Sequence, residues 1–193
     1  TTHEDTLSDP FKWKGKRLVF VNSMSDVFHA DVPDPYVRRM FEVMLAAPWH
    51  TFQVLTKRPS RALRFWNRNA DLFDDGEIPR HIWLGTSVEN QEARHRVDHL
   101  RSVPAALRFL SCEPLIGPLT LDLSGVHWVI VGGESGPVRR EMKTEWVVAI
   151  RDQCMAADIP FFFKQWGGRT PKAGGRELEG EVWDAMPERA LGT

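Results

Sequence analysis

HWVIVGGESG, residues 127–136, shows the pattern that decides the fold: an apolar run that ends in small and polar residues. The pattern occurs five more times, as RLVFVNSMSD (17–26), TFQVLTKRP (51–59), HIWLGTSVEN (81–90), LRFLSCEP (107–114) and IPFFFKQWG (159–167). Each run is typical of a buried strand of a parallel sheet. Since the carboxyl ends of parallel strands open on one face, where ligands bind, the pattern also predicts where the functional surface lies.

Segments with helical spacing of their apolar residues lie between most of these runs. They cover residues 33–48, 59–73, 87–103 and 143–158. Alternating strands and helices predict a parallel sheet with right-handed crossovers. The connection between the fourth and fifth runs, residues 113–126, is near the minimum length for a parallel crossover, so we expect a loop with a short strand or 3-10 turn there.

Six strands fit either an open doubly wound sheet or part of a barrel. The glycine-rich turn of a dinucleotide-binding unit is absent after the first strand, where NSMSDVFH stands, and no phosphate-binding Walker loop occurs. Polar clusters follow nearly every strand and not one switch point, which favours an α/β fold with a partial (β/α) barrel, TIM-barrel-like, of about six mainly parallel strands. We expect one barrel domain over 1–166 and an extended C-terminal arm over 167–193, with a small hairpin around Gly180.

The overall composition excludes a protein whose whole surface is strongly charged, and it excludes little else. The 193 residues carry 25 basic and 26 acidic side chains and a net charge of -1, so no global field favours nucleic acid or a membrane surface, although a local basic patch is compatible with these counts. Only two cysteines occur, and no apolar stretch reaches the length of a membrane span. These features predict a reduced, cytoplasmic protein.

Four strand-end residues are our candidates for catalytic roles: Asp26, Lys57, Glu113 and Lys164. Asp26 can take a proton or orient a substrate, and its alternative role is helix capping. Lys57 stands beside another cation, as in an anion clamp, or as a solvated pair. Glu113 is fixed between a strand and a proline, and Lys164 leaves an apolar strand that can lower its pKa, unless its chain extends to solvent.

Small and polar strand-end residues are our candidates for cofactor binding. They are Asn22, Ser23, Ser25, Thr86, Ser87, Gly132, Gly133 and Glu134. The glycine pair can let a ligand approach the backbone or form an anion-binding nest, and Glu134 can contact a hydroxyl or ammonium group. The alternatives are helix capping by the serines and a tight turn at the glycines.

No metal site is predicted. Cys112 stands beside a glutamate, as a nucleophile or metal ligand would, but a single cysteine is more often a buried apolar residue. His95 and His99 have the spacing of a ligand pair on a polar helix, where an exposed face is the commoner outcome.

Six ordered strings resemble one family: FVNSMSDVFHADVPD, TFQVLTKRP, WLGTSVENQ, RFLSCEPLIGPL, WVIVGGESGP and PFFFKQWG. The chain is similar, from the first strand to Trp166, to the bacteriophage-associated radical-SAM-like proteins of phages and prophages, a family of unknown function. The resemblance implies S-adenosylmethionine and a [4Fe-4S] cluster in a full-length member. Three closely spaced cysteines that hold such a cluster are missing here, and the start at Thr1 indicates a truncated chain that does not bind the cluster itself.

The leading hypothesis is thus the substrate- and SAM-binding part of a radical-SAM-like enzyme whose reaction is unknown. The alternative is a non-catalytic module that binds a phosphate, nucleotide or nucleic acid through Lys57, Arg58, Arg139, Arg140 and Trp166. A third is a cofactor-free hydrolase or lyase. The partner would be a small molecule or nucleic acid and not a membrane, and an uncovered sheet edge would favour a homodimer.

Overall fold

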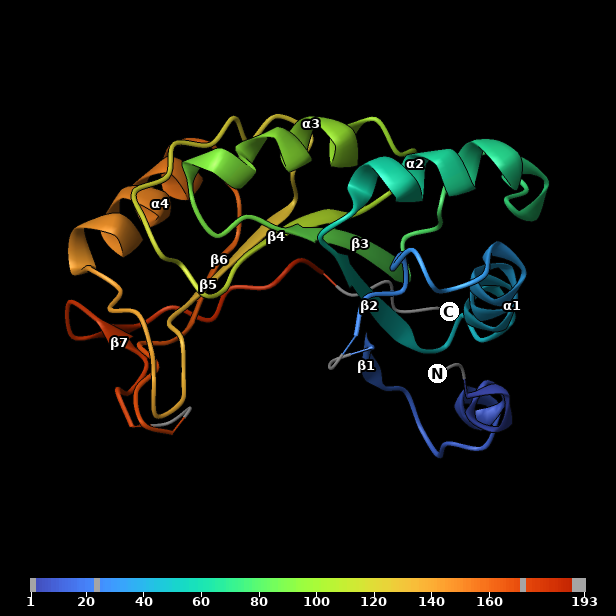
Figure 1. Cartoon of the computed structure of the whole chain (residues 1–193), viewed down its shortest axis with the longest axis horizontal. Coiled ribbons are helices and arrows are strands. Elements are labelled where there is room, and N and C mark those ends of the chain that lie inside the picture. The colour runs from blue at the N-terminus through green and yellow to red at the C-terminus, as the bar shows by residue number, and fades with distance from the viewer. Residues whose placement is uncertain (1–2, 23–24, 171–172, 189–193) are drawn as a thin grey trace.

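A computed structural model describes residues 3–22, 25–170 and 173–188, and its centre is one curled parallel sheet (Figure 1). The strands are β1 (Leu18–Val21), β2 (Thr51–Thr56), β3 (Ile82–Ser87), β4 (Arg108–Cys112), β5 (Trp128–Gly132) and β6 (Phe161–Gln165), which neighbour one another in chain order. The predicted half-barrel is confirmed. β4 and β5 pair directly in parallel although their connection contains neither a helix nor a strand.

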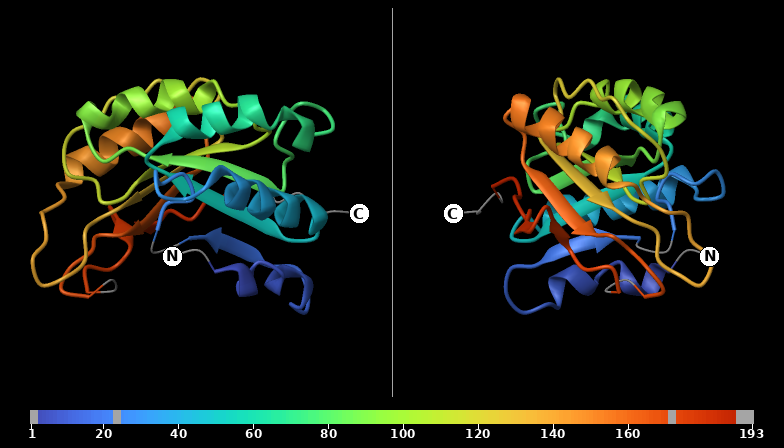
Figure 2. Two further views of the ribbon diagram at one scale, coloured as in Figure 1. Left: turned by 45° about the vertical axis from the view of Figure 1, so that its right-hand side comes forward. Right: turned by 90° about the vertical axis from the view of Figure 1, so that its left-hand side faces the viewer.

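The helices lie on the convex side of the sheet and leave the concave side open (Figures 1 and 2). They are α1 (Asp34–Ala46), α2 (Pro59–Arg68), α3 (His95–Arg101) and α4 (Thr144–Ala156). Short 3-10 turns occur at η1 (Glu4–Thr6), η2 (Asp9–Phe11), η3 (Ala70–Leu72) and η4 (Gln91–Arg94). None of the helices in the described ranges is long and apolar enough to cross a membrane.

Two separate apolar layers form because successive side chains of a strand point to opposite faces. The larger layer packs between the sheet and the helices. The smaller one lies on the concave face and consists of Trp83, Leu107, Phe109 and Trp128. The Phe109 ring lies directly over Gly85, where an added Cβ would be only 2.4 Å from the ring. The glycine therefore lets one aromatic ring cover two strands at the base of the concave face.

The C-terminal segment returns to the sheet and does not extend away from it as predicted. The hairpin around Gly180 is present as β7 (Glu177–Leu178) and β8 (Glu181–Val182), and Leu178 is fully buried. The Phe163 N–H then donates to the Trp183 carbonyl over 2.8 Å. Further on, Met186 packs against the concave aromatic layer, so the chain end covers the base of the half-barrel.

Candidate functional site

The concave face contains a cavity of about 1080 Å³ that extends along the strands to their carboxyl ends. It receives residues from all six strands and from Met186 in the C-terminal segment. Seven of the predicted site residues line it: Asn22, Ser25, Asp26, Lys57, Ser87, Glu113 and Lys164. The strand-end pattern therefore located a real concave surface.

The wall of the cavity carries hydroxyl and amide groups above an apolar floor. Ser87 and Ser111 are paired in register on β3 and β4, and the same row continues with Ile130 and Phe162. Both serines are almost fully buried, and within the described part of the chain neither hydroxyl has a hydrogen-bond partner. Buried polar groups normally have partners, so these hydroxyls are available to a ligand.

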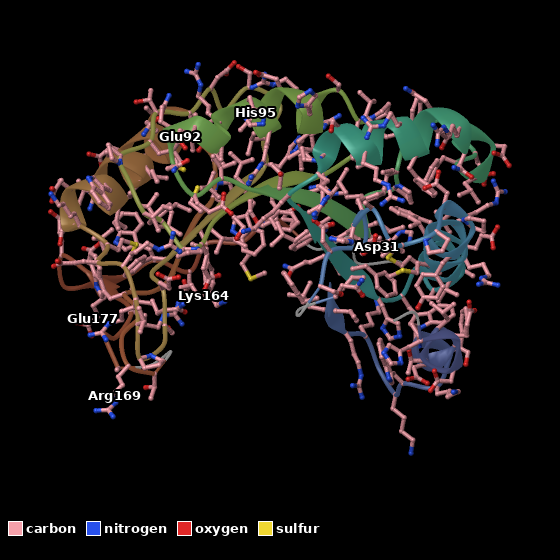
Figure 3. All side chains as sticks on the ribbon, in the orientation of Figure 1. Asp31, Glu92, His95, Lys164, Arg169 and Glu177 are labelled. Atoms are coloured by element: carbon pink, nitrogen blue, oxygen red, sulfur yellow. The ribbon has the colours of Figure 1, made fainter. Side chains whose placement is uncertain are left out.

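Glu113 forms the charged end of the cavity together with two residues of β6. Its carboxylate accepts hydrogen bonds from Lys164 Nζ over 2.9 Å and from Gln165 Nε2 over 2.8 Å. Glu113 is 24% exposed and Lys164 51%, so both can be reached from solvent. Lys164 lies on the concave side of the arch (Figure 3). The cluster therefore presents one anion and one cation side by side to a ligand.

The two predicted glycines allow close packing at the end of β5 without themselves lining the cavity. An added Cβ on Gly132 would lie 3.2 Å from the Glu113 side chain, which crosses β5 at this position to reach β6. At Gly133 an added Cβ would lie 1.9 Å from the Trp166 carbonyl oxygen. The Gly133 N–H donates to the Gln165 carbonyl over 2.8 Å, so it is not directed at an anion. Both glycines serve close packing.

Asp26 lines the cavity, but its hydrogen-bonding capacity is used within the chain. Its oxygens accept hydrogen bonds from the backbone N–H of Phe28 and of Lys57, at 2.9 and 3.0 Å. The Thr56 hydroxyl donates over 2.7 Å, and Arg58 Nη1 over 3.1 Å. The carboxylate thus joins the segment after β1 to the end of β2, which is a structural role that sequence alone did not distinguish from catalysis.

Lys57 belongs to a small ion network at the rim. Its Nζ lies 2.6 Å from Glu89 Oε1, and Arg96 donates to the other oxygen over 2.8 Å. Burial alone would raise the pKa of Glu89, but the hydrogen bond from Lys57 and the charges of both cations outweigh burial and lower that pKa. Lys57 is therefore already paired with Glu89 when a ligand enters the cavity.

Three of the remaining predicted residues do not reach the cavity or are outside the described ranges. Thr86 points to the helices, and its hydroxyl donates to the Thr56 carbonyl over 2.7 Å. Glu134 is held by Arg140, whose guanidinium binds both carboxylate oxygens and lowers the Glu134 pKa to about 2. Ser23 lies outside the described residues.

The cysteines are placed away from the cavity. Cys112 is fully buried in the layer between the sheet and the helices, and so is Cys154. Burial raises the pKa of both thiols, that of Cys154 to about 12. Among the described residues, no group of three histidine, cysteine or acidic side chains could hold a metal ion. A thiolate role for either cysteine therefore has no support in the geometry.

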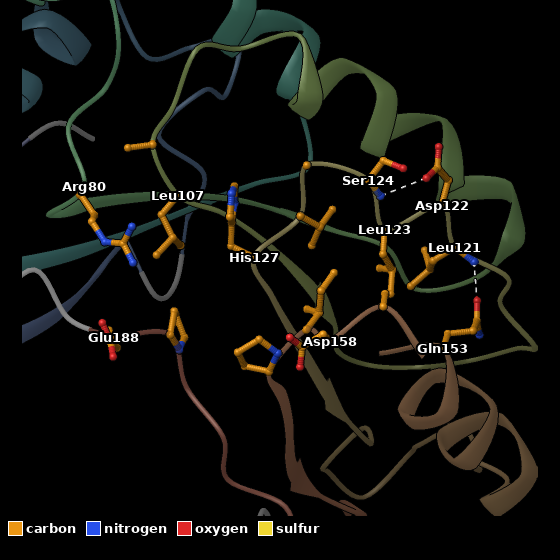
Figure 4. A pocket seen from close by; sticks show the side chains of 17 residues that line it. Arg80, Leu107, Leu121, Asp122, Leu123, Ser124, His127, Gln153, Asp158 and Glu188 are labelled. Carbon is orange, nitrogen blue, oxygen red and sulfur yellow. Dashed lines mark hydrogen bonds between the residues drawn. The ribbon is translucent and has the colours of Figure 1, made fainter. Parts of the chain in front are cut away.

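A second hollow, of about 810 Å³, lies at the opposite, amino-terminal ends of the strands (Figure 4). Its lining includes three leucines, His127 and four charged residues, Arg80, Asp122, Asp158 and Glu188. Burial and the neighbouring Arg108 charge lower the His127 pKa, and its Nδ1 accepts the Arg108 N–H over 3.0 Å. No predicted site residue lines this hollow, so the concave cavity is the better candidate.

Several lining residues were not among the predicted site residues, including Ser111, Trp128, Phe162, Gln53 and Met186. Gln53 lies inside β2, and Met186 lies in the C-terminal segment. Gln53 alternates with Leu55 and Lys57 on one face of the strand, and this spacing of two was the signal that could have revealed it. The sequence around Met186 does not indicate that it lines the cavity, because its position depends on how the C-terminal segment folds back onto the sheet.

The fold and site thus define an α/β half-barrel with an open cavity at the strand carboxyl ends. The profile of one family, described as a protein of unknown function (DUF5131), matches residues 1–187. The chain belongs to this family. No curated protein and no solved structure matches the chain.

Proposed function

We propose that this half-barrel is the S-adenosylmethionine- and substrate-binding part of a radical-SAM-like enzyme of phages and prophages. The observation that carries the proposal is the concave cavity, in which unpaired hydroxyls and a carboxylate–ammonium pair lie above an aromatic floor. Apolar pockets with a few convergent polar groups are the usual form of small-molecule sites.

The cavity residues fit the chemical groups of S-adenosylmethionine. Its planar adenine suits the apolar floor that Trp128 and Phe162 contribute. Ribose hydroxyls and ring nitrogens suit the unpaired Ser87 and Ser111 hydroxyls. The amino and carboxylate groups of the methionine end are complementary to Glu113 and Lys164, respectively. This assignment uses residues of four strands, β3 to β6, together with Glu113 directly after β4, and no charge that is already saturated by backbone donors.

The described residues do not fit an iron–sulfur cluster. Cluster irons are held by cysteine thiolates, whereas Cys112 and Cys154 are buried on the helix side with raised thiol pKa values. The part assigned to this chain is therefore ligand binding and exclusion of water from the cavity. Bound S-adenosylmethionine would supply the reactive group.

Isothermal titration of S-adenosylmethionine tests the binding proposal directly. We expect saturable binding that weakens about tenfold in Ser111→Leu, which fills the cavity wall, and in Glu113→Gln. Replacement of the exposed Thr120 by leucine adds a similar side chain outside the cavity and should leave affinity unchanged. Absence of saturable binding, or equal affinity in the cavity variants, would contradict the proposal.

The radical-SAM-like relationship has its own test. The natural gene product, purified without oxygen, should contain about four iron atoms and four sulfides per chain if it holds such a cluster. Added reductant and S-adenosylmethionine should then release 5′-deoxyadenosine. If the product contains no iron but still binds S-adenosylmethionine, the radical reaction is excluded and the proposed binding site stands.

The alternative binding module has less geometric support. Arg58 is paired with Asp26 and Arg140 with Glu134, and the Trp166 indole N–H donates to the Glu177 carbonyl over 2.7 Å. These groups are therefore occupied within the chain. Binding of nucleotides or inorganic phosphate that depends on Arg58 and Arg140, with no affinity for S-adenosylmethionine, would favour the alternative.

A further inference from the structure

The loop between η2 and β1 is the most basic short segment of the chain. Residues 11–17, FKWKGKR, contain four cations, two aromatic rings and no acidic residue. All four cations, Lys12, Lys14, Lys16 and Arg17, are exposed, and Lys12 pairs with Asp9 over 2.9 Å. The net charge of -1 for the whole chain conceals this local patch.

Two aromatic rings are exposed beside these cations. Phe11 is 47% exposed, and Trp49, in the turn that follows α1, is 44% exposed. Their ring centroids lie 6.4 Å apart in an edge-to-face arrangement. Large apolar side chains that are exposed together, next to charges of one sign, are typical of an interaction surface.

A buried histidine fixes the shape of this loop. His50 is 1% exposed, and its Nδ1 accepts the Arg17 N–H over 3.1 Å. Its Nε2 lies 2.9 Å from the Pro10 carbonyl oxygen. The Trp13 ring packs on His50 at 5.5 Å, and the Arg17 guanidinium lies over Trp13 at 5.3 Å. Both ends of the loop, the Trp13 ring and the Arg17 guanidinium are therefore held in place, which lowers the entropic cost of binding.

The patch continues into the concave cavity. Directly after Arg17 the chain enters β1, where Leu18 and Phe20 line the cavity, and Phe20 is 43% exposed. The loop thus leads directly into an edge strand whose residues line the cavity, at the amino end of that strand.

We propose that the Phe11–Arg17 loop and Trp49 form a binding surface for single-stranded nucleic acid. The cations contact the phosphates, and Phe11 and Trp49 provide rings on which unpaired bases stack. A membrane surface fits less well, because surface-bound segments use the apolar face of a helix, whereas residues 12–17 form no helix. The proposal uses none of the S-adenosylmethionine-binding residues and so does not depend on the proposed function.

Fluorescence anisotropy of the whole chain with a labelled single-stranded oligonucleotide of mixed sequence tests the proposal. With four phosphate contacts, log affinity should fall with log salt with a slope of about −3, which is a loss of about fiftyfold between roughly 50 and 200 mM salt. A complementary duplex should bind more weakly, because its bases are not open to stacking.

Two variants separate the charge from the rings. Lys12→Glu with Lys14→Glu should weaken binding about tenfold or more and make the salt slope shallower. Phe11→Ala with Trp49→Ala should weaken binding at least tenfold while the salt slope stays unchanged. Two matched variants on other surfaces should bind like the parent: Arg64→Glu with Arg94→Glu, and Val138→Ala with Met155→Ala.

Several results would overturn the proposal. One is absence of oligonucleotide binding at low salt, and another is an equal loss of affinity in the matched variants. Binding of vesicles that contain phosphatidylserine, without binding of the oligonucleotide, would assign the surface to anionic lipid. Should the Trp49 variant fail to fold in a thermal melt, the lysine variant alone decides, since both of its side chains are exposed.

Discussion

Asp26 and Glu113 are both carboxylates that follow a strand and face the same cavity, yet their surroundings differ. Asp26 accepts hydrogen bonds from two backbone N–H groups, a buried threonine and an arginine. Among the described residues, Glu113 accepts hydrogen bonds only from the side chains of Lys164 and Gln165. The comparison teaches that a carboxylate bound by backbone donors holds loops together, whereas one bound only by side chains can exchange its partners for a ligand.

The largest expected effect comes from removing the first carboxylate. Asp26→Ala should lower the free energy of unfolding by about 3 kcal/mol, because four donors lose their acceptor and two of them are backbone groups. Urea denaturation gives this value. The matched Glu113→Ala variant should lose less than about 1 kcal/mol. Similar losses for both variants would show that the comparison between the two carboxylates is wrong.

A smaller effect is expected from crowding the second carboxylate. Gly132→Ala places a methyl group 3.2 Å from the Glu113 side chain, which must then shift by a few tenths of an ångström. We expect a loss of about 1 kcal/mol in urea denaturation and a displaced Glu113 in a crystal structure. If Glu113 keeps its contacts with β6 in the variant, Gly132 is not what positions it.

The Lys164 side chain should matter little for stability. Lys164→Met removes an ion pair whose lysine is 51% exposed, and exposed pairs contribute about 0–1 kcal/mol. We therefore expect a change of about 0.5 kcal/mol or less in denaturation, together with weaker binding of S-adenosylmethionine. A loss above about 2 kcal/mol would assign Lys164 a structural role like that of Asp26.

The smallest effect concerns a third carboxylate, Glu134. The hydrogen bonds from Arg140 lower its pKa from 4.5 to about 2, so it should stay ionised far below the usual range for glutamate. Because the pKa is lowered in the folded state, the stabilisation by this pair is present above pH 4.5 and is lost as pH falls towards 2. Exposure keeps the stabilisation small.

Carboxyl-carbon NMR measures the Glu134 titration without relying on that small stability change. Arg140→Met should return the Glu134 pKa towards 4.5, whereas Arg139→Met, which removes the neighbouring cation, should not. A Glu134 signal that titrates near 4.5 in the unmodified chain would show that the pair does not persist in solution.

The curled sheet could be predicted from sequence because each strand has two sequence signals, an apolar run and the polar residues that follow it. The direction of individual side chains could not. In β3 every residue is buried, so the apolar pattern does not reveal that Thr86 faces the helices while Ser87 faces the cavity. The pairing of Asp26 with donors 30 to 32 residues away is likewise a property of the assembled fold.

The position of the C-terminal segment was also not predictable from sequence, because it depends on contacts between distant residues. Its glycine, proline and charge content indicates an extended segment, and it is largely irregular in the structure. Its attachment rests on a few groups, such as the Ala185 carbonyl that accepts the Trp128 indole N–H over 2.9 Å. Such contacts between residues far apart in sequence leave no periodic signal.

The position of that tail also has a consequence for biosynthesis. A chain is made from its amino end, so all six strands are complete before Ala185 and Met186 leave the ribosome. Until then the aromatic layer of Trp83, Phe109 and Trp128 lacks the cover of the tail and is open to contact with other nascent chains. The cover of this aromatic layer is therefore added only after all six strands have been made, so the order of synthesis leaves its rings uncovered for a time.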